Sequence, residues 1–313
     1  MNIVLATDDN FVQHCSVTIV SVAKNNPNVT FYILTEGLNS ENQILLNNLG
    51  VILNIIKINR NVLNKFPMPD DDKLSHISLA TYYRLLISSL LPIDVHKIIY
   101  LDCDIVVRKN IYELWNEDIS KFAMAAVFQI ARENIESISR LGYSIENGYF
   151  NAGVLLINLD YWRNNNVESQ LIDFISNYHS RIVFHDQDTL NAVLHSKVKE
   201  LSCRWNMLSS YFKLDVHKII NMKVNGNMKN ISYNYSKEIL SEILDPTIIH
   251  FVSRPKPWSR KCYHPYMYEY YVYLSKIKNK LCFPNSFDYF ISRFIYIAIK
   301  SRVFVLLVKK NNG

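Results

Sequence analysis

Two aspartates one residue apart are the first feature of this sequence that could do chemistry. Asp102 and Asp104 follow the apolar run HKIIYL at residues 96–101, which is typical of a buried strand. Residues i and i+2 of a strand point to the same side, so both carboxylates would face one way and Cys103 the other. A divalent cation such as Mg²⁺ or Mn²⁺ would relieve the repulsion between them. A metal site is therefore one interpretation, and a strand that ends in capping aspartates is the plainer one.

A third interpretation makes the first aspartate a nucleophile, as in aspartyl-phosphate phosphohydrolases. Those enzymes usually open the chain with DxDG[TV]. Here the motif begins at residue 102, and Ile105 follows it in place of glycine. The sequence therefore disfavours a phosphohydrolase.

Two basic side chains later in the chain suit the same chemistry. His250 closes the apolar segment TIIH, and Lys256 lies between two prolines on a loop that must be stiff and extended. A histidine can complete a carboxylate metal site, and a lysine can neutralise phosphate oxygens. Taken alone, His250 fits a hydrogen-bonded histidine at a strand end better than a metal ligand.

Two more polar clusters adjoin apolar segments. In FHDQDTLNAVL, at residues 184–194, Asp186, Gln187 and Asp188 occupy the first turn of a predicted helix. Acids there suit the helix dipole and capping, which is a purely structural use. In YFNAGVLLIN, Asn151 precedes two small residues at the mouth of an apolar strand, where a ligand can approach closely.

The elements that must position these residues alternate between strand and helix. The hydrophobic pattern predicts strands at residues 2–7, 29–35, 51–58, 96–101, 122–128, 149–159 and 247–252. It predicts helices at about residues 17–26, 39–49, 77–91, 160–178 and 186–195. This order is typical of parallel βαβ units with a nucleotide-type crevice at the carboxyl ends of the strands.

Composition limits the class of protein. The 313 residues are 49% hydrophobic and 20% charged, which is ordinary for a soluble enzyme and wrong for a disordered chain. The net charge of +6 is too small and too scattered to indicate nucleic-acid binding. Five widely spaced cysteines without a CxxC pair argue against a disulfide framework or a zinc site and suit a reducing compartment. No signal peptide and no membrane-spanning helix are expected.

The C-terminal segment differs in kind from the rest. Residues 286–310, SFDYFISRFIYIAIKSRVFVLLVKK, are apolar around much of a helix and carry basic residues that break and close the pattern. A basic, aromatic-rich helix of this type suits an anionic membrane surface, on which it would lie without spanning the bilayer. The alternative is a helix packed on the main domain with its Lys and Arg side chains reaching outward.

Taken together and in this order, six blocks resemble glycosyltransferase family 8, the retaining enzymes that use a nucleotide-sugar donor. The resemblance is closest to bacterial lipooligosaccharide α-galactosyltransferases and related lipopolysaccharide glycosyltransferases. It covers roughly residues 1–262 through the blocks ATDDN, TYYRL, YLDCDIVVR, YFNAGVLLINLDYW, HDQDTLN and HFVSRPKPW.

The resemblance implies an α/β fold of the GT-A type, with a Rossmann-like nucleotide-binding mixed sheet flanked by helices and a helical C-terminal extension. Residues 1–262 would form the catalytic domain and residues 263–313 the extension. The reaction would move a hexose, galactose or glucose, from a UDP-sugar to a saccharide acceptor, in the synthesis of the lipopolysaccharide or lipooligosaccharide core.

The family's nucleotide-binding positions carry over residue by residue. Ala6, Asp8 and Asn10, in ATDDN, would hold the uracil and ribose of UDP. Arg84, in TYYRL, would lie against the donor sugar or its phosphate, and Lys256 against the β-phosphate.

The resemblance also assigns a metal site. Asp102, Asp104 and His250 would ligate Mn²⁺, or Mg²⁺, which bridges the diphosphate of the donor. Cys103 lies among the donor-site positions of the motif, although its side chain is expected to face the core. Ser253 is counted with the donor site too, and it departs from the family, which often has glycine before the proline of this block.

The hexose would be held by Asn151, Asp186 and Gln187, and the last two are the catalytic candidates. Gln187 is where the family would place a group on the face opposite the leaving UDP, but an amide is a poor nucleophile. We therefore favour attack on the front face, with a UDP oxygen taking the acceptor proton and Asp186 orienting the sugar. Relatives can carry an aspartate near the sugar where this chain has Phe128 and Gln129, which leaves donor and acceptor choice open.

Two other classes of protein would share the βαβ units at the start of the chain. A sugar-nucleotide pyrophosphorylase would need a glycine-rich basic loop after its first strand, and ATDDNFVQH is neither. A non-catalytic nucleotide-sugar binding protein would lose the metal ligands, and all three are present. We expect a cytoplasmic enzyme, peripheral on the inner face of the membrane, whose partners are a UDP-hexose, a lipid-linked saccharide acceptor and an anionic membrane surface, with no nucleic acid.

Overall fold

The structure is a computed structural model of the chain, and it divides into two compact units. It describes residues 1–63, 66, 79–129, 134–209, 242, 245–252, 254–259, 262, 264–277 and 290. The first unit comprises Met1–Cys15, Asn26–Cys103 and Tyr112–Leu201. The second comprises Ser16–Asn25, Asp104–Ile111 and the described part of Ser202–Gly313.

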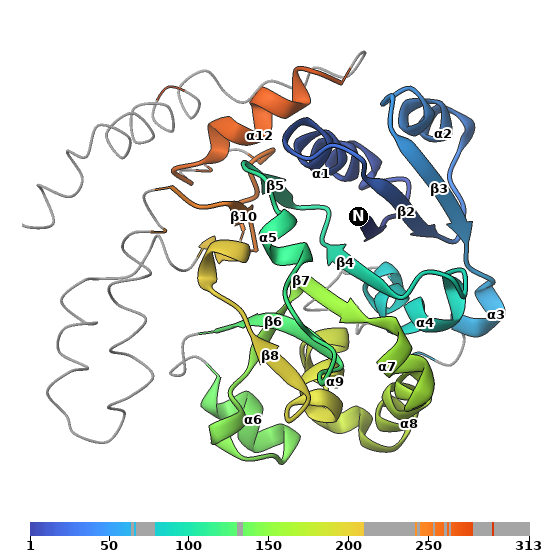
Figure 1. The fold of residues 1–313 in the computed structure, drawn as a ribbon, viewed down its shortest axis with the longest axis vertical. Coiled ribbons are helices and arrows are strands. Elements are labelled where there is room, and N and C mark those ends of the chain that lie inside the picture. Colours follow the sequence, from blue (N-terminus) through green and yellow to red (C-terminus); the bar gives the residue numbers. More distant parts are fainter. Residues whose placement is uncertain are drawn as a thin grey trace, which may run out of the picture. The chain divides into compact units, whose positions relative to one another are not determined.

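The described part of the first unit contains a seven-stranded mixed sheet in the order β3-β2-β1-β4-β7-β6-β8 (Figure 1). β1, β2, β3 and β4 run parallel, whereas β7 is antiparallel to both β4 and β6. The strands are β1 (Asn2–Ala6), β2 (Thr30–Thr35), β3 (Ile52–Lys57), β4 (Lys97–Leu101), β6 (Met124–Phe128), β7 (Phe150–Asn158) and β8 (Val198–Glu200). The continuous apolar runs of the sequence became the central strands because both faces of a covered sheet are buried.

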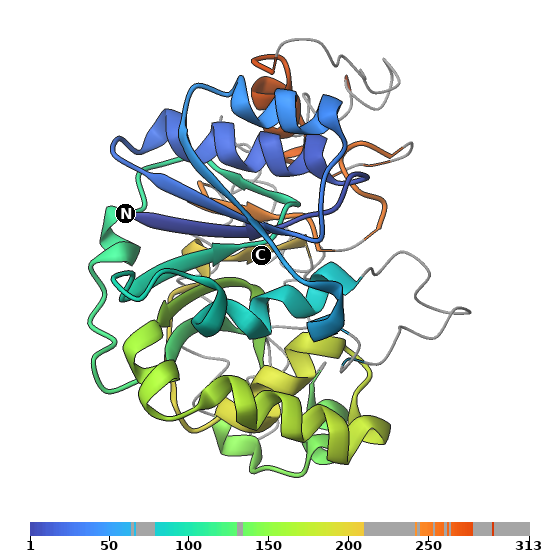
Figure 2. The same ribbon diagram turned by 90° about the vertical axis from the view of Figure 1, so that its right-hand side faces the viewer.

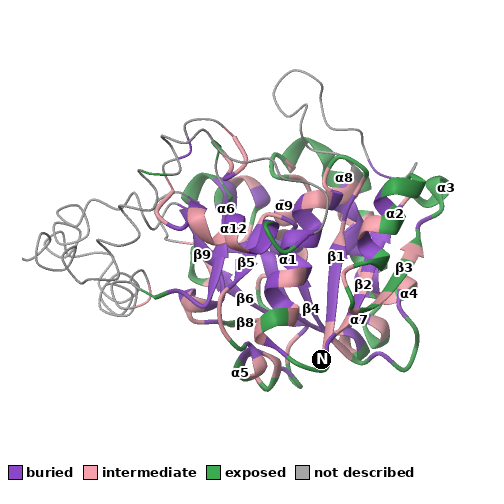
Figure 3. Cartoon of the chain, turned by 90° about the horizontal axis from the view of Figure 1, so that it is seen from above, coloured by how far each residue is buried: buried purple, intermediate pink, exposed green. Residues whose placement is uncertain are grey.

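Helices α7, α8 and α9 run along one side of this sheet, below the strands in Figure 2. Their apolar side chains share a core with the strands, and Trp162 and Leu171 of the helices join Tyr100 of β4 in it. The central strand β1 is accordingly drawn as buried in Figure 3. The helices of this unit are α2 (Ser40–Asn47), α3 (Arg60–Leu63), η1 (Leu79–Leu86, a 3₁₀ helix), α4 (Ile87–Leu90), α5 (Tyr112–Trp115), α6 (Ile135–Leu141), η3 (Ile145–Asn147), α7 (Leu159–Asn164), α8 (Val167–Tyr178), η4 (His179–Arg181) and α9 (His185–Leu194).

The second unit contains a three-stranded sheet within its described residues, in the order β5-β10-β9. The strands are β5 (Ile105–Val107), β9 (Met207–Leu208) and β10 (Ile248–His250). β10 pairs antiparallel with β5 and parallel with β9. Helices η5 (Cys203–Trp205) and α12 (Met267–Leu274) belong to this unit, and α1 (Val12–Asn25) begins in the first unit and continues into it.

The seven predicted strands are confirmed, but two helix predictions are wrong in detail. The segment predicted as one helix at 77–91 forms the 3₁₀ helix η1 followed by the short α4. The helix predicted at 160–178 is two helices, because Asn166 adopts a left-handed conformation with φ 49° between α7 and α8. The short strands β5, β8 and β9 were not predicted from the sequence.

The C-terminal extension lies outside the described residues except for its first part and Phe290. The four described cysteines are free and buried, and Cys282 lies outside the described residues. Among the described residues, no helix is long and apolar enough to cross a membrane.

Gly148, immediately before β7, gives a test of how tightly this region is packed. Its φ of 63° and ψ of −173° belong to a region that is essentially restricted to glycine, and an added Cβ would lie 2.6 Å from Cδ1 of Phe128. Gly50 also has a positive φ, 69°, but an added Cβ would meet nothing within 4 Å.

We expect Gly50→Ala to lower the free energy of unfolding by about 1–2 kcal/mol, because only backbone strain is added. Gly148→Ala should cost about 2–5 kcal/mol, because strain and steric overlap with Phe128 add together. Urea unfolding of the two variants measures the difference. Equal losses would show that the space around Gly148 is not as tight as the structure has it.

Candidate active site

A wide bulge in β7 builds the polar site of the first unit. Ala126 of β6 pairs with Leu155, and Phe128 pairs with Phe150, so one residue of β6 stands opposite the four residues 151–154 of β7. A bulge of this kind lets a strand aim backbone groups and side chains away from the ladder. The bulge contains Asn151, Ala152 and Gly153, which the sequence predicts to lie at the mouth of a strand.

Arg84 lies at the centre of the site and is almost fully buried, with 6% of its surface exposed. Its guanidinium donates to Oδ1 of Asp102 at 2.7 Å and to the backbone oxygen of Ala152 at 2.6 Å, and its Nε lies 2.8 Å from Oδ2 of Asp186. Its planar fork also lies 4.4 Å from the ring centre of Tyr100. One side chain thus joins η1, the end of β4, the bulge of β7 and the start of α9.

Burial and charge act in opposite directions on this group. Burial by itself would lower the pKa of Arg84, but Asp102 and Asp186 outweigh it and hold the pKa above its usual value. For Asp186, burial is the larger effect, so its pKa is raised even though Arg84 and a 2.7 Å hydrogen bond from Thr81 Oγ1 favour the carboxylate. Asp186 is therefore a buried acid that depends on Arg84 for its charge.

Gln187 and Asn151 form a second polar group in the same unit. Oε1 of Gln187 accepts hydrogen bonds from Nδ2 of Asn151 at 2.9 Å and from the backbone N–H of Ala152 at 3.1 Å. Asn151 Oδ1 in turn accepts from the N–H of Gly153 at 3.0 Å. The structure thus brings these two predicted hexose-binding residues together through the bulge.

The predicted nucleotide-binding residues lie at the carboxyl end of β1. Asp8 Oδ1 accepts from the N–H of Asn10 at 2.9 Å and from that of Phe11 at 3.2 Å, which fixes a tight turn before α1. Ala6 accepts a hydrogen bond from Sγ of Cys103 at 3.1 Å. Cys103 is 8% exposed and so lies in the core, as its place between the two aspartates had predicted.

The second unit holds the other ionic group, centred on Asp104. Its Oδ1 lies 3.1 Å from Nε2 of His250, and its Oδ2 accepts from Nζ of Lys256 at 2.6 Å. The antiparallel pairing of β5 and β10 places His250 opposite Ile105, directly after Asp104. Nδ1 of His250 lies 2.9 Å from Oδ1 of Asn206, which is fully buried.

The charges around Asp104 keep it ionised. Burial by itself would raise the pKa of Asp104, but Lys256 and His250 outweigh it and hold the pKa well below its usual value. Lys256 also donates to the backbone oxygens of Phe251 and Val252 at 2.5 and 2.9 Å. The loop after β10 is therefore tied to the aspartate by this lysine.

Several residues that contact these three groups are not predicted from the sequence. Thr81, Tyr149, Arg140 and Asn206 were not singled out, and the sequence had no signal for them beyond the neighbouring motifs TYYRL and YFNAG. The sequence predicts a helix-capping role for Asp188. In the structure it is fully buried, and its Oδ2 accepts from the backbone N–H groups of Val183 and Phe184, just before α9. Ser253 lies outside the described residues.

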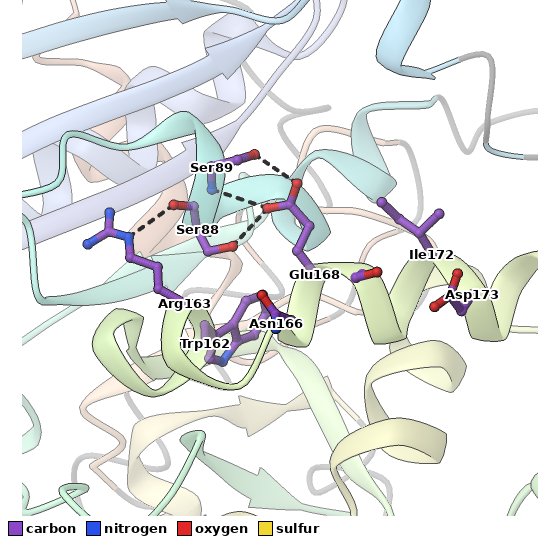
Figure 4. A pocket seen from close by; sticks show the side chains of 9 residues that line it. Ser88, Ser89, Trp162, Arg163, Asn166, Glu168, Ile172 and Asp173 are labelled. Atoms are coloured by element: carbon purple, nitrogen blue, oxygen red, sulfur yellow. Dashed lines mark hydrogen bonds between the residues drawn. The ribbon is translucent and has the colours of Figure 1, made fainter.

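A separate hollow of about 510 Å³ lies elsewhere on the first unit, next to α4 and α8 (Figure 4). Glu168 reaches across it and accepts from the hydroxyls of Ser88 and Ser89 at 2.8 Å each. No predicted site residue lines this hollow. Glu168 therefore joins α8 to α4 and has no place in the candidate site.

The buried Arg84 generates a pH-dependent prediction. Arg84→Met should lower the free energy of unfolding by about 3–5 kcal/mol at neutral pH, because it leaves the buried Asp186 carboxylate without its cation. The pKa of Asp186 then rises further in the folded variant. Since the unfolded pKa is about 4, the variant loses stability relative to wild type as the pH rises from there through the raised folded pKa. The deficit should therefore shrink toward acidic pH.

Arg163→Met is the matched control for this change. Arg163 donates to the backbone oxygens of Ser88, Val95 and Pro92 and forms no ion pair among the described residues. Its loss should destabilise the protein by an amount that does not vary with pH. Urea unfolding between about pH 4.5 and pH 7.5 compares the two variants, and equal pH dependence would contradict the assigned role of Asp186.

The sequence was compared with protein-family models and with known proteins. Residues 2–262 match the family model of glycosyl transferase family 8. The chain is 30% identical to general stress protein A of Bacillus subtilis over 89% of this chain and 94% of that protein. It is 26% identical to the lipopolysaccharide 1,3-galactosyltransferase of Salmonella typhimurium over 82% of this chain and 72% of that one.

The fold agrees with that of a solved enzyme. The galactosyltransferase LgtC, crystallised with donor and acceptor sugar analogues, superposes with a TM-score of 0.76 at 24% identity, over 90% of this chain and 98% of that one. This likeness confirms the predicted α/β fold of the GT-A type. The family match, which spans residues 2–262, shows that the chain is a glycosyltransferase and belongs to glycosyl transferase family 8.

Proposed function

We propose that this glycosyltransferase moves a hexose, galactose or glucose, from a UDP-sugar to a saccharide acceptor, with a divalent cation and with retention of the anomeric configuration. The observation that carries the proposal is the acid–acid–imidazole group of Asp102, Asp104 and His250 in a member of this family. Within the second unit, Nε2 of His250 lies 3.1 Å from Oδ1 of Asp104. Asp102 is kept near the other two by the chain itself, since only Cys103 separates it from Asp104.

The donor set suits a hard divalent cation such as Mn²⁺ or Mg²⁺. Carboxylate oxygens are the ligands these cations prefer, and an imidazole nitrogen is compatible with Mn²⁺. The hydrogen bond between Nδ1 of His250 and Asn206 fixes the ring and directs Nε2 toward Asp104. When bound, the cation would offset the negative charge of the donor diphosphate.

The remaining groups act on the donor through charge and hydrogen bonding. Lys256 holds its ammonium against Asp104, where it could turn to the β-phosphate and stabilise the charge that develops as UDP leaves. Asp8 and Asn10 form the turn assigned to the nucleoside, and Asn151 and Asp186 are assigned to the hexose. Arg84 gives its hydrogen bonds to protein groups in the structure, so we assign it the role of fixing Asp186 and Asp102.

The anomeric configuration is retained because the acceptor hydroxyl attacks the anomeric carbon from the same face that UDP leaves. A phosphate oxygen of UDP can accept the proton of the acceptor hydroxyl as the new bond forms. Asp186 orients the sugar and forms no covalent bond with it. The acceptor we propose is a saccharide of the lipopolysaccharide or lipooligosaccharide core, supported by the name of the Salmonella relative, a lipopolysaccharide 1,3-galactosyltransferase.

The proposed activity is tested with the purified chain, Mn²⁺ and a panel of UDP-sugars, with slow release of UDP as the signal. We expect UDP-galactose or UDP-glucose to be cleaved, and chelation of the metal to stop the reaction. Asp104→Asn should lower turnover by at least about 100-fold, because it removes a metal ligand and the partner of Lys256.

Asp94→Asn, a change of the same kind at an exposed aspartate, is the control and should leave turnover unchanged. Asp94→Asn should unfold at the wild-type urea concentration, whereas Asp104→Asn loses its ion pairs with Lys256 and His250 and should unfold earlier. Circular dichroism under the assay conditions checks that both variants are folded when turnover is compared. Full metal-dependent activity of Asp104→Asn would contradict the proposed site.

We further propose that residues 1–262 act as the catalytic domain and that residues 263–313 bring it to an anionic membrane surface. Lys300, Arg302 and Lys309 belong to a C-terminal stretch, 290–313, that has five basic residues and no acid. Basic residues near an anionic bilayer each contribute about 1 kcal/mol to binding.

Changing Lys300, Arg302 and Lys309 together to Gln should weaken binding to anionic vesicles by about 100-fold in co-sedimentation and leave turnover on a soluble acceptor unchanged. The same change at three exposed lysines of the described chain, Lys57, Lys121 and Lys197, serves as the control. An equal loss of vesicle binding in both triple variants would show that net charge, and not the C-terminal segment, is responsible.

A further inference from the structure

The side-chain carbonyl oxygen of Gln187 already accepts two hydrogen bonds within the protein. A carbonyl oxygen has two lone pairs. In the structure, Asn151 Nδ2 takes one at 2.9 Å and the backbone N–H of Ala152 takes the other at 3.1 Å. The oxygen of Gln187 is thus bound on both sides by the bulge of β7.

Backbone N–H groups fix which end of each amide is oxygen. The N–H of Ala152 can only donate, so the atom of Gln187 that it meets must be the oxygen. In the same way, the N–H of Gly153 donates to Asn151 at 3.0 Å, which makes that atom Oδ1 and turns Nδ2 toward Gln187. The orientation of both amides therefore follows from donors whose identity is certain.

The nitrogen end of Gln187 is fixed by Tyr149 and Asp188. Nε2 donates to the hydroxyl of Tyr149 at 3.0 Å, and that hydroxyl donates to Oδ1 of Asp188 at 2.7 Å. Burial first, and then the charge of Asp188, raise the pKa of Tyr149, so its hydroxyl keeps the proton that it gives to the carboxylate. The oxygen of Tyr149 is then turned to accept from Gln187.

Asp188 is itself held on every side. It is fully buried and pairs with Arg140 at 2.9 Å, and its Oδ2 also accepts from the N–H groups of Val183 and Phe184 at 2.7 Å each. An ionised carboxylate only accepts hydrogen bonds, so it sets the direction of the bonds that end on it. A chain of fixed donors and acceptors thus runs from Arg140 through Asp188 and Tyr149 to Gln187.

We infer that three positioning residues make Gln187 a hydrogen-bond donor to the bound sugar. They are Arg140, Asp188 and Tyr149, which we call the Gln187 relay. Both lone pairs of Oε1 and one hydrogen of Nε2 are engaged, so the second Nε2 hydrogen is the group that Gln187 offers to a hydroxyl of the hexose. Its oxygen is not offered to the anomeric carbon. This inference rests on the proposed function, which places Gln187 at the sugar.

The relay can be tested first without any substrate. The chain has five glutamines, so selective ¹⁵N-glutamine labelling gives few side-chain amide signals, and Gln187→Ala identifies the pair that belongs to Gln187. Tyr149→Phe removes one hydroxyl and should shift the Gln187 pair and speed the rotation of its amide. Tyr143→Phe removes a hydroxyl that donates to the backbone oxygen of Gly148 at 3.0 Å and should leave the pair unchanged.

A double-mutant cycle on donor cleavage then tests the role in turnover. We expect Tyr149→Phe to lower kcat about tenfold, with kcat/KM falling by the same factor, and Tyr143→Phe to have no effect. In the background of Gln187→Ala, Tyr149→Phe should cost nothing further, because its effect passes through Gln187. A merely structural role of Tyr149 would give the same tenfold loss in both backgrounds.

The amide signals and the turnover measurements together distinguish a failure of the relay from a failure of the proposed function. A wild-type chain that cleaves none of the UDP-sugars would contradict the proposed function, and the amide signals would still decide whether the relay exists. Unchanged Gln187 signals in Tyr149→Phe, or additive losses in the cycle, would overturn the inference.

Discussion

A buried guanidinium is the constraint on which the first unit's site depends. Arg84 neutralises Asp186 and also binds Asp102 and the backbone oxygen of Ala152. Burying a carboxylate without a partner costs several kcal/mol, so Asp186 can occupy its position only while Arg84 occupies its own. The rigid fork of arginine is needed here because one side chain must meet groups from three elements at fixed angles.

The bulge of β7 is the second device, and it works through the backbone. In the bulge, four residues of β7 stand opposite a single residue of β6. The N–H and C=O groups of these four residues are therefore not all used in the ladder with β6, and some of them bind groups of the site. The oxygen of Ala152 meets Arg84, its N–H meets Gln187, and the oxygen of Gly153 accepts from the N–H of Asp102 at 2.9 Å. Small side chains at these positions keep the backbone accessible. The end of β4 and the two amides are therefore placed by main-chain geometry.

Much of the fold could be predicted from the sequence because its central strands are continuous apolar runs. The break at Asn166 could have been noticed in the run of three asparagines, a residue that tolerates left-handed backbone. The strand β5 could not be predicted from the sequence, because its three residues form a strand only by pairing with β10, which lies more than a hundred residues later. Local pattern carries no information about such pairing.

The candidate site shows the same division between local and distant information. Asp102, Asp104, Gln187 and Asn151 stand in motifs that are legible in the sequence. Tyr149, Arg140 and Asn206 meet Asp188 and His250 across 39 or more positions of sequence, and no local spacing predicts these contacts. Asp188 was visible as an acid in a first helical turn, but its burial and its link to Tyr149 required the structure.

The most direct measurement of the central claim is anomalous diffraction from crystals of the chain grown with Mn²⁺ and UDP. The account predicts one strong manganese peak, with oxygen ligands from Asp102 and Asp104 and Nε2 of His250 as the nitrogen ligand. The UDP diphosphate should complete the coordination, with Lys256 beside the β-phosphate. A manganese peak bound to other residues, or UDP bound at these residues without any metal peak, would contradict it.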